Sequence, residues 1–396
     1  MKEEKLETPY FLLHEEKLER NILELKAALK VYWNNYEIGY SCKTNSTPWI
    51  MKYMKKYDIK MEVVSDNEYL LAEKVGYKNK EIIFNGPNKG KKIFKRALLN
   101  GSYINIDSLN EVEWLEEIDS NLLEEVEIGI RVNFDLEKDC PNETAYLKDG
   151  SRFGFSYENG DVLKVIERVN KLNNIKIKGL HIHNTTKTRS IRAYESICKC
   201  ACKIAINLNY TLKYIDIGGG FFGGVPGKTT FNEYLERIST VLKTTFEISK
   251  TKLIIEPGSA LIGSPIDFVC EVIDVKDTFA KRIVTVNGSR NLIDPFFMKN
   301  SYFYNLVIKD DRKIKKEQII CGYTCLDNDR LMRLENNQEL KRGDIIIFEK
   351  VGSYTITLSP LFIEYFPTIY VKKKDNEIIC VREKWSIEEF LQKQIF

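Results

Sequence analysis

The sequence contains few histidines and no long hydrophobic segment. Only 3 of its 396 residues are histidine, and His181 and His183 lack cysteines at the spacing of a zinc finger. No stretch approaches the roughly 20 apolar residues that cross a bilayer, and the N-terminal MKEEKLETPYFLLHEEK has no apolar signal core. We therefore expect no metal site, no membrane segment and a cytoplasmic location.

The chain also lacks a strong excess of charge of either sign. Lys and Arg total 60, Asp and Glu total 57, and the net charge is +3. These charges are dispersed along the chain, whereas a nucleic-acid-binding protein carries a basic patch or stripe. No nucleic-acid partner is therefore expected.

A disulfide framework is not expected either, because the cysteines number nine and have no regular spacing. The densest group is CKCACK, with Cys198, Cys200 and Cys202. On a helix this spacing divides the three thiols between faces. We interpret them as small buried apolar residues, and the sequence assigns them no other role.

What the sequence does have is a long alternation of strand-like and helix-like segments. The strand-like runs are residues 36–42, 59–65, 81–86, 103–108, 126–133, 177–184, 212–220 and 252–258. Helical patterns lie between them at 67–76, 92–101, 109–118, 162–172, 194–208 and 231–245. Eight strands, each followed by a helix or connection, predict an α/β fold: a (β/α)8 TIM barrel over residues 30–260.

From about residue 261 the pattern changes to strand-like runs without intervening helices, such as IDFVCEVIDV, KRIVTVNG and DIIIFEKV. This favours an antiparallel β domain. An N-terminal strand, PYFLL, could join it, followed by an amphipathic helix that carries Leu18, Ile22, Leu25 and Leu29. We therefore assign residues 1–29 and 261–396 to the second domain, which closes on a short helix, SIEEFLQKQIF.

Polar or glycine residues follow the carboxyl ends of the predicted barrel strands, where barrel enzymes build their active sites. They are Lys43, Ser65, Asn85, Asp107, Arg131, His183, Gly218 to Gly220, and Glu256. Each residue alone is explained as a turn former or a solvated strand end. Their combination predicts an active site.

Two of these strand ends point to one ligand. In YEIGYSCKTN, strand alternation puts Gly39 and Ser41 on the face of Lys43, so small residues clear space beside a lysine. In DIGGGFFGG, consecutive glycines let backbone N–H groups approach a phosphate. A lysine that can form a Schiff base and a phosphate loop together suggest pyridoxal phosphate.

At this point the motifs carry a resemblance. YSCKTN resembles the lysine motif of the fold-type III pyridoxal phosphate decarboxylases, the group of ornithine, arginine and diaminopimelate decarboxylases. EVVSDNE, RFGF, GLHIHNTT, DIGGGF, EPG, CGYTCLDND and VGSYT follow in family order. The resemblance implies an alanine-racemase-like fold and a carboxy-lyase that releases CO2 and an amine from an amino acid or an amino-acid conjugate.

The resemblance also implies roles for individual residues. Lys43 would carry the cofactor as a Schiff base, His183 would stack on its ring, and Glu256 would hydrogen-bond the pyridine nitrogen. Cys325 would protonate the α-carbon in a site of the second subunit, so the active sites of a homodimer would be shared. The remaining cofactor contacts would be Arg131, beneath the cofactor, and the phosphate-binding residues Thr186, Gly218, Gly219, Gly220 and Tyr354.

The chain departs from the family pattern where the substrate binds. Ser259 and Asp294 stand where the diaminopimelate enzymes have arginine, and Leu326 replaces the acidic residue after the family cysteine. The candidate substrate contacts are thus Ser259, Asp294, Asp327 and Asp329. We expect the substrate not to be meso-diaminopimelate but an amino acid with a cationic or neutral distal end.

Three alternatives remain. The chain could be a diaminopimelate decarboxylase in which another residue, such as Arg290, binds the distal carboxylate. It could be an amino-acid racemase of similar fold, although such racemases have arginine in place of Glu256. It could also be a non-catalytic regulatory homologue, which the presence of Lys43, Glu256 and Cys325 disfavours.

Overall fold

The computed structural model describes residues 6–119, 122, 124–208 and 211–395. The chain splits into two compact units. Asn21–Ala260 form the barrel unit, and Met1–Arg20 together with Leu261–Phe396 form the β unit. The first helix, α1 (Glu15–Tyr32), spans this division, and its predicted apolar face of Leu18, Ile22, Leu25 and Leu29 is buried.

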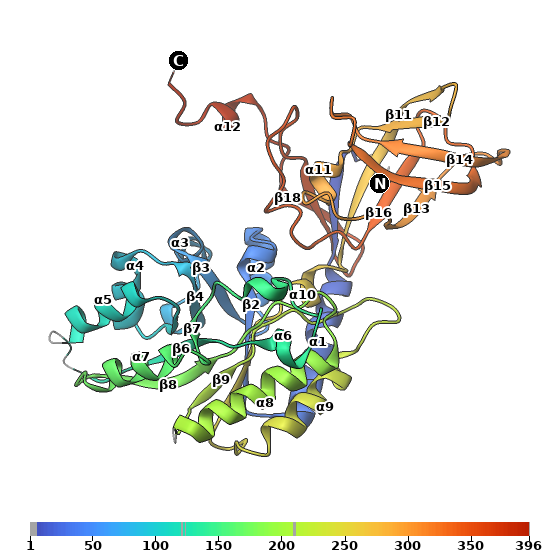
Figure 1. The fold of residues 1–396 in the computed structure, drawn as a ribbon. Coiled ribbons are helices and arrows are strands. Elements are labelled where there is room, and N and C mark those ends of the chain that lie inside the picture. Colours follow the sequence, from blue (N-terminus) through green and yellow to red (C-terminus); the bar gives the residue numbers. More distant parts are fainter. Residues whose placement is uncertain (1–5, 120–121, 123, 209–210, 396) are drawn as a thin grey trace. The chain divides into compact units, whose positions relative to one another are not determined.

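The barrel unit is a closed parallel barrel, as the sequence predicted (Figure 1). Among the described residues its strands pair in the order β5, β4, β3, β2, β10, β9, β8, β6, and β5 pairs with β6 to close the ring. All of these pairings are parallel. The strands are β2 (Tyr36–Ser41), β3 (Lys60–Ser65), β4 (Ile82–Asn88), β5 (Tyr103–Ile106), β6 (Val126–Asn133), β8 (Ile175–His181), β9 (Tyr214–Asp216) and β10 (Lys252–Ile255).

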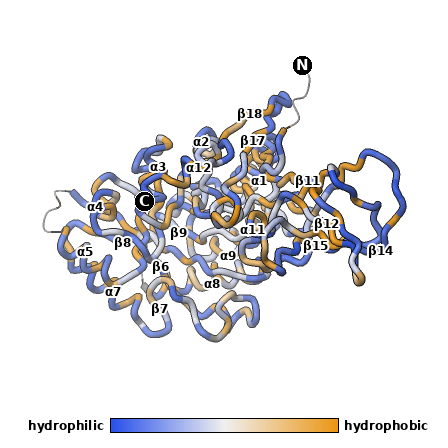
Figure 2. Tube along the Cα trace, turned by 90° about the horizontal axis from the view of Figure 1, so that it is seen from above, coloured by the Kyte–Doolittle hydropathy of each residue, from blue (hydrophilic) through white to orange (hydrophobic). Residues whose placement is uncertain are grey.

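Helices connect these strands and cover the barrel's outer surface (Figure 1). Hydrophilic and hydrophobic stretches alternate along outer helices such as α5 and α7 (Figure 2), as expected for helices with one buried face. The helices are α2 (Pro48–Lys55), α3 (Asp66–Val75), α4 (Lys91–Leu99), α5 (Leu109–Asp119), α6 (Leu136–Asp139), α7 (Asp161–Asn170), α8 (Ile191–Leu208), α9 (Phe231–Leu242) and α10 (Ser259–Ile262). A short strand, β7 (Phe155–Ser156), pairs with β6.

Local sequence signals explain where several of these helices begin and end. The side chain of Thr230 accepts a hydrogen bond from the backbone of Glu233 and so begins α9 with a capping box. Ser65 caps α3 in the same way, by accepting from the Glu68 N–H, and Gly76 ends that helix with a φ of 106°. Ser65, one of the polar strand ends, is thus a helix cap.

The β unit contains a mixed sheet rather than a purely antiparallel one. Most of its pairings are antiparallel, but β1 (Tyr10–His14) runs parallel to β17 (Thr368–Lys372), and β12 (Arg282–Val286) runs parallel to β14 (Ile314–Cys321). The N-terminal strand does join this sheet, because β1 also pairs with β11 (Ile266–Asp277). The other elements are β13 (Phe303–Val307), β15 (Arg330–Gln338), β16 (Ile345–Glu349), β18 (Ile378–Arg382), α11 (Arg290–Ile293) and α12 (Ile387–Leu391).

The three clustered cysteines of α8 do not share one face, as their spacing indicated. Cys198 and Cys202 are buried as predicted, but the prediction was wrong for Cys200, which is partly exposed because it lies between the buried positions of the helix. Within the described part of the chain, no helix combines the length and the apolar character that crossing a membrane requires.

Candidate active site

Lys43 lies two residues after the end of β2, in a 3-10 turn of Cys42–Thr44, and is paired with a buried carboxylate. Its Nζ donates to Glu62 Oε2 at 2.8 Å, and the Ser41 hydroxyl donates to the same oxygen at 2.6 Å. Burial works to raise the pKa of Glu62, but the Lys43 charge and hydrogen bonds from Lys43, Ser41 and Asn85 outweigh it and hold the pKa below its usual range. Lys43 and Glu62 therefore form an ion pair at the end of the barrel.

Gly39, in YEIGYSCKTN, makes room for a neighbouring apolar side chain. A Cβ atom on Gly39 would lie only 2.7 Å from the Ile83 Cδ1, which is closer than real side chains pack. The same Cβ would lie 3.5 Å from the Glu62 Cβ and 3.8 Å from the Glu256 Cγ, which are ordinary contacts. The glycine thus clears space for the Ile83 side chain.

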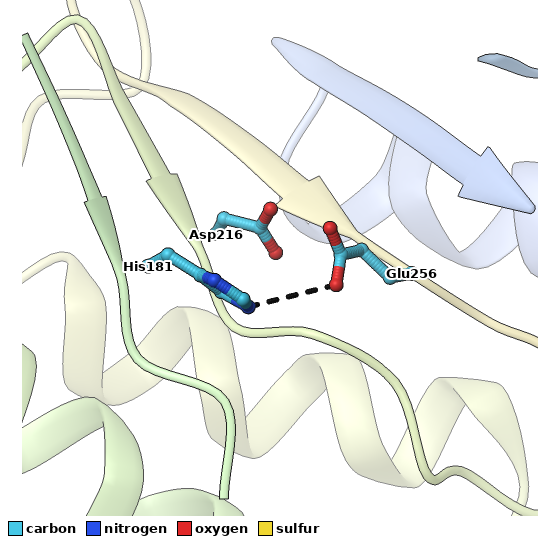
Figure 3. Close-up of side chains that lie close together, drawn as sticks. All are labelled: His181, Asp216 and Glu256. Atoms are coloured by element: carbon cyan, nitrogen blue, oxygen red, sulfur yellow. Dashed lines mark ion pairs between the residues drawn. The ribbon is translucent and has the colours of Figure 1, made fainter. Parts of the chain in front are cut away.

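Three further ionisable side chains converge from neighbouring strands (Figure 3). His181 ends β8, Asp216 ends β9 and Glu256 follows β10. A ring nitrogen of His181 and one carboxylate oxygen each of Asp216 and Glu256 lie within 4.8 Å of one another. The His181 Nε2 is 3.6 Å from the Glu256 Oε2. All three residues are buried.

This burial sets the protonation of the cluster. Burial raises the pKa of Asp216 to about 7. Burial, and then the negative charges of Asp216 and Glu62, raise the pKa of Glu256 well above its usual value. Burial and the Arg131 charge lower the pKa of His181 well below its usual range. Burial thus favours the protonated form of Glu256 and the neutral form of His181.

The glycine loop after β9 lies against His183. A Cβ atom on Gly218, whose φ is 71°, would lie 2.3 Å from the His183 Nδ1. A Cβ on Gly219 would lie 2.1 Å from the Glu256 carbonyl oxygen. Only glycine fits at these two positions. Enclosure and the Arg131 charge lower the pKa of His183 to about 3, so its imidazole is also neutral.

Arg131 connects the barrel interior to the RFGF segment. Its Nη1 donates to Asp107 Oδ2 at 3.2 Å, and its guanidinium lies 4.4 Å from the centroid of the Phe153 ring. The other Asp107 oxygen accepts from the Gly154 N–H at 3.0 Å. Asp107 and Arg131, both taken from strand ends in the sequence, thus hold this loop. Thr186 lies in the loop after β8, where its hydroxyl accepts from the Arg189 N–H at 3.1 Å.

The other predicted site residues divide between the two units. Ser259, at the start of α10, is partly exposed in the barrel unit. In the β unit, Cys325 and Asp327 are exposed and Tyr354 is partly exposed with a φ of 55°. Asp329 is buried, and its carboxylate accepts from the Thr324 hydroxyl at 2.6 Å.

Two of the candidate substrate contacts have structural partners. Asp329 also accepts from the Arg290 N–H at 2.8 Å and so shapes the CGYTCLDND loop. Asp294 is buried and its Oδ2 accepts from Arg290 Nε at 3.0 Å and Nη2 at 2.9 Å. The backbone N–H groups of Met298 and Lys299 donate to the same carboxylate. The charge of Asp294 is thus neutralised within the β unit.

Sequence reasoning missed Glu62, His181 and Asp216. It considered residues at the strand ends, whereas these three lie inside the strands or at their last position. His181 and Asp216 each stand two residues before a predicted strand end and so lie on the same strand face as that residue, whereas Glu62 stands three residues before Ser65 and lies on the opposite face from it. A charged residue at an inward barrel position, where apolar side chains dominate, was the signal that could have found them.

Comparisons with known proteins identify the family of this chain. Residues 15–263 match the family described as pyridoxal-dependent decarboxylase, pyridoxal binding domain. The diaminopimelate decarboxylase of Aquifex aeolicus is 28% identical over 331 residues, covering 81% of this chain and 77% of the relative. That of Archaeoglobus fulgidus is 25% identical over 397 residues, covering 98% and 93%.

Solved structures show the same fold. The diaminopimelate decarboxylase of Methanocaldococcus jannaschii superposes with a TM-score of 0.87 at 20% identity, covering 99% of this chain and 93% of that one. The Helicobacter pylori enzyme in complex with L-lysine gives 0.83 at 22% identity, covering 98% and 97%. Each of these relatives is named a diaminopimelate decarboxylase. The chain belongs to the pyridoxal-dependent decarboxylase family.

Proposed function

We propose that this decarboxylase attaches pyridoxal phosphate to Lys43 and acts on an amino acid whose distal end has no free carboxylate. The observation that carries the proposal is the pairing of Lys43 with the buried Glu62, next to a second buried carboxyl group, Glu256, which shares the Asn85 amide with Glu62. One face of the barrel thus offers an amine for covalent attachment and a buried acid for a ring nitrogen.

The described residues fit the cofactor. Polar atoms of the cluster are buried without a hydrogen-bond partner: His181 Nδ1 and Nε2, His183 Nδ1, Asp216 Oδ2 and Arg131 Nε. Leaving buried polar groups unsatisfied costs free energy, so a site with several such atoms suits a polar ligand. Gly218 and Gly220 have φ values of 71° and 94°, and a glycine turn of this kind can present backbone N–H groups to an anion. The Gly218 N–H itself donates to Asp216 Oδ1 at 2.9 Å.

Each residue then has a chemical task. The cofactor supplies an electron sink for the carbanion left when carbon dioxide departs. Lys43 provides the point of attachment, and Glu62 keeps its Nζ charged. Glu256 brings the proton that a pyridine nitrogen requires, and the neutral imidazole of His183 offers a flat surface for stacking.

The proposed preference for a substrate without a distal carboxylate rests on the absence of charged side chains at Ser259 and Leu326. Ser259 cannot form the bidentate contact by which a guanidinium binds a carboxylate, and Leu326 cannot bind an amine. Asp294 is neutralised by Arg290, so repulsion by Asp294 is not part of the proposal. The same pairing engages Arg290, which disfavours it as a substitute anchor.

The names of the relatives favour a second candidate, decarboxylation of meso-diaminopimelate itself. In that case residues other than Ser259 and Arg290 would hold the distal carboxylate. The two candidates share the chemistry at Lys43 and differ only at the far end of the substrate.

A substrate panel distinguishes them. Carbon dioxide release should be measured for L- and D-ornithine, lysine, arginine and meso-diaminopimelate. We expect kcat/KM for meso-diaminopimelate to be about 10- to 100-fold below that of the best substrate, the effect of one lost charge-assisted hydrogen bond. Ser259→Arg should narrow this difference. Preferred turnover of meso-diaminopimelate by the wild-type enzyme would contradict the proposal.

We also propose that the enzyme is a two-fold dimer in which Cys325 completes the site of the other subunit. Cys325 is exposed on a loop that Asp329 holds in place, as expected for a side chain that acts across an isologous interface.

Complementation tests this shared site. Lys43→Ala and Cys325→Ala chains should each be nearly inactive, but co-expression should restore about a quarter of the wild-type activity. The reason is that roughly half of the dimers are mixed, and each mixed dimer has one intact site. No recovery in confirmed heterodimers, or full activity in a monomer, would overturn the proposal.

A further inference from the structure

A chain of side-chain hydrogen bonds runs through the barrel interior toward the site. The Tyr214 hydroxyl donates to Asn105 Oδ1 at 3.0 Å, and Asn105 Nδ2 donates to Asn85 Oδ1 at 2.9 Å. Asn85 Nδ2 then donates to Glu256 Oε1 at 2.5 Å and to Glu62 Oε1 at 3.3 Å. One amide nitrogen thus joins the carboxyl groups that serve the two ends of the site.

Two glycines make space for the side chains in this series of hydrogen bonds. A Cβ on Gly129 would lie 1.9 Å from Asn105 Oδ1 and 2.3 Å from the Tyr214 hydroxyl. A Cβ on Gly179 would lie 1.9 Å from the Tyr214 Cζ. Neither glycine has a positive φ, so space rather than backbone conformation explains them. The barrel is built around Tyr214 and Asn105.

The hydrogen bonds between Tyr214 and the two carboxyl groups all have the same donor-to-acceptor direction. Carboxylate oxygens accept hydrogen bonds, so Asn85 turns its NH2 group toward them and its carbonyl toward Asn105. Asn105 in turn donates to that carbonyl and accepts from Tyr214. Without the Tyr214 hydroxyl, Asn105 Oδ1 loses this donor, and the orientation of the Asn105 amide is less strictly fixed.

The same bonds orient the carboxyl groups. With Oε1 held by Asn85, Glu62 presents Oε2 to Lys43 at 2.8 Å. Glu256 likewise has its Oε2 on the side of His181, at 3.6 Å from Nε2. Asn85 therefore determines which oxygen of each carboxyl group is available for the reaction.

We propose that Asn85 is a positioning residue that couples Glu62 to Glu256, and that Asn105 and Tyr214 fix the orientation of its amide. The inference rests on the proposed attachment of the cofactor to Lys43. The three residues it adds to the site, Asn85, Asn105 and Tyr214, form none of the hydrogen bonds described above with Lys43 or with the glycine loop.

The pH at which the Lys43 nitrogen loses its proton gives a measure of this coupling. Asn85 holds Oε1 of Glu62 and so keeps Oε2 facing Lys43, where the carboxylate stabilises a proton on the Lys43 nitrogen. Loss of the Asn85 donor should therefore make the Lys43 nitrogen lose its proton at lower pH. The other charged or titratable groups that act on these carboxyl groups are Cys42, Glu68, Arg131, His181, His183, Asp216 and Tyr214.

The experiment measures the visible absorbance of the cofactor-loaded enzyme against pH, together with the dissociation constant for pyridoxal phosphate. In Asn85→Leu the midpoint of the absorbance change should move to lower pH by roughly half a unit to one unit. Tyr214→Phe, which removes only a hydroxyl, should move it in the same direction by a smaller amount.

Tyr103→Phe is the matched control. Tyr103 packs against Tyr214 with ring centroids 5.6 Å apart, but its hydroxyl accepts from Lys252 and lies outside the chain of bonds. Its removal should leave the midpoint unchanged. Because Tyr214 acts through Asn85, the double variant Asn85→Leu with Tyr214→Phe should match Asn85→Leu alone.

Thermal unfolding identifies variants that fail to fold, and if Asn85→Leu is one of them, Tyr214→Phe and Tyr103→Phe decide the matter. Equal midpoints in Tyr214→Phe, Tyr103→Phe and the wild-type enzyme would overturn the inference while leaving the proposed function intact. A wild-type enzyme that takes up no cofactor at Lys43 would instead overturn the proposed function.

Discussion

Replacing Lys43 with alanine should lower kcat by at least about 10³-fold and abolish the yellow colour of the purified enzyme. The reason is that covalent catalysis needs the amine itself, and no diffusing group matches its effective concentration. Lys43 follows β2 and lies beside Glu62, so the variant also leaves a buried carboxylate without its cation.

Lys43→Arg separates these two effects. Its guanidinium keeps a positive charge near Glu62, but it does not form the covalent attachment. We expect this variant to be as inactive as Lys43→Ala and more stable in thermal unfolding of the cofactor-free protein.

Borohydride treatment gives the direct readout. It should fix the cofactor covalently to the peptide that contains Lys43 in the wild-type enzyme, as detected by mass spectrometry, and in neither variant. Turnover within about 10-fold of wild type in Lys43→Ala would contradict covalent attachment at this residue.

The barrel could be predicted from the sequence because its strands are separated by clear helical patterns. All eight predicted strands form, and their order around the barrel is the order along the chain. Strand β5 illustrates the reason: the run YINI is followed directly by the amphipathic helix α5, and only a parallel barrel or sheet explains such alternation.

The β unit was harder to predict because the sequence of one strand does not indicate whether it pairs in a parallel or an antiparallel direction. The segment KRIVTVNG predicts a strand, and β12 forms there, but its parallel partner β14 lies beyond α11 and β13. Alternation fixes which face is buried. It does not say which neighbour a strand will take across a long connection.

The site was predicted at its edge and missed in its interior. The strand-end pattern drew attention to Lys43 and Glu256, but the acid that pairs with Lys43 is Glu62, in the middle of β3. Likewise, Asn85 was seen only as a polar strand end. Its role depends on a contact with Glu256, 171 residues away in the sequence, which no local pattern reports.

Glu256→Gln should lower kcat by about 10²- to 10⁴-fold, the usual contribution of a positioned proton donor, while the enzyme still takes up the cofactor. Burial and the charge of Asp216 raise the pKa of Glu256 well above its usual value, which favours the protonated carboxyl group. Glutamine has the same shape but no acidic proton to give to a ring nitrogen.

Glu256→Asp is the matched variant, because it keeps the acid and shortens the side chain. If acidity is what matters, aspartate should retain more activity than glutamine; if shape matters, the order should reverse. Both kcat and cofactor content should be measured, since a merely structural role would lower the two together. A kcat within about 3-fold of wild type in Glu256→Gln would show that protonation of the ring nitrogen does not depend on this residue.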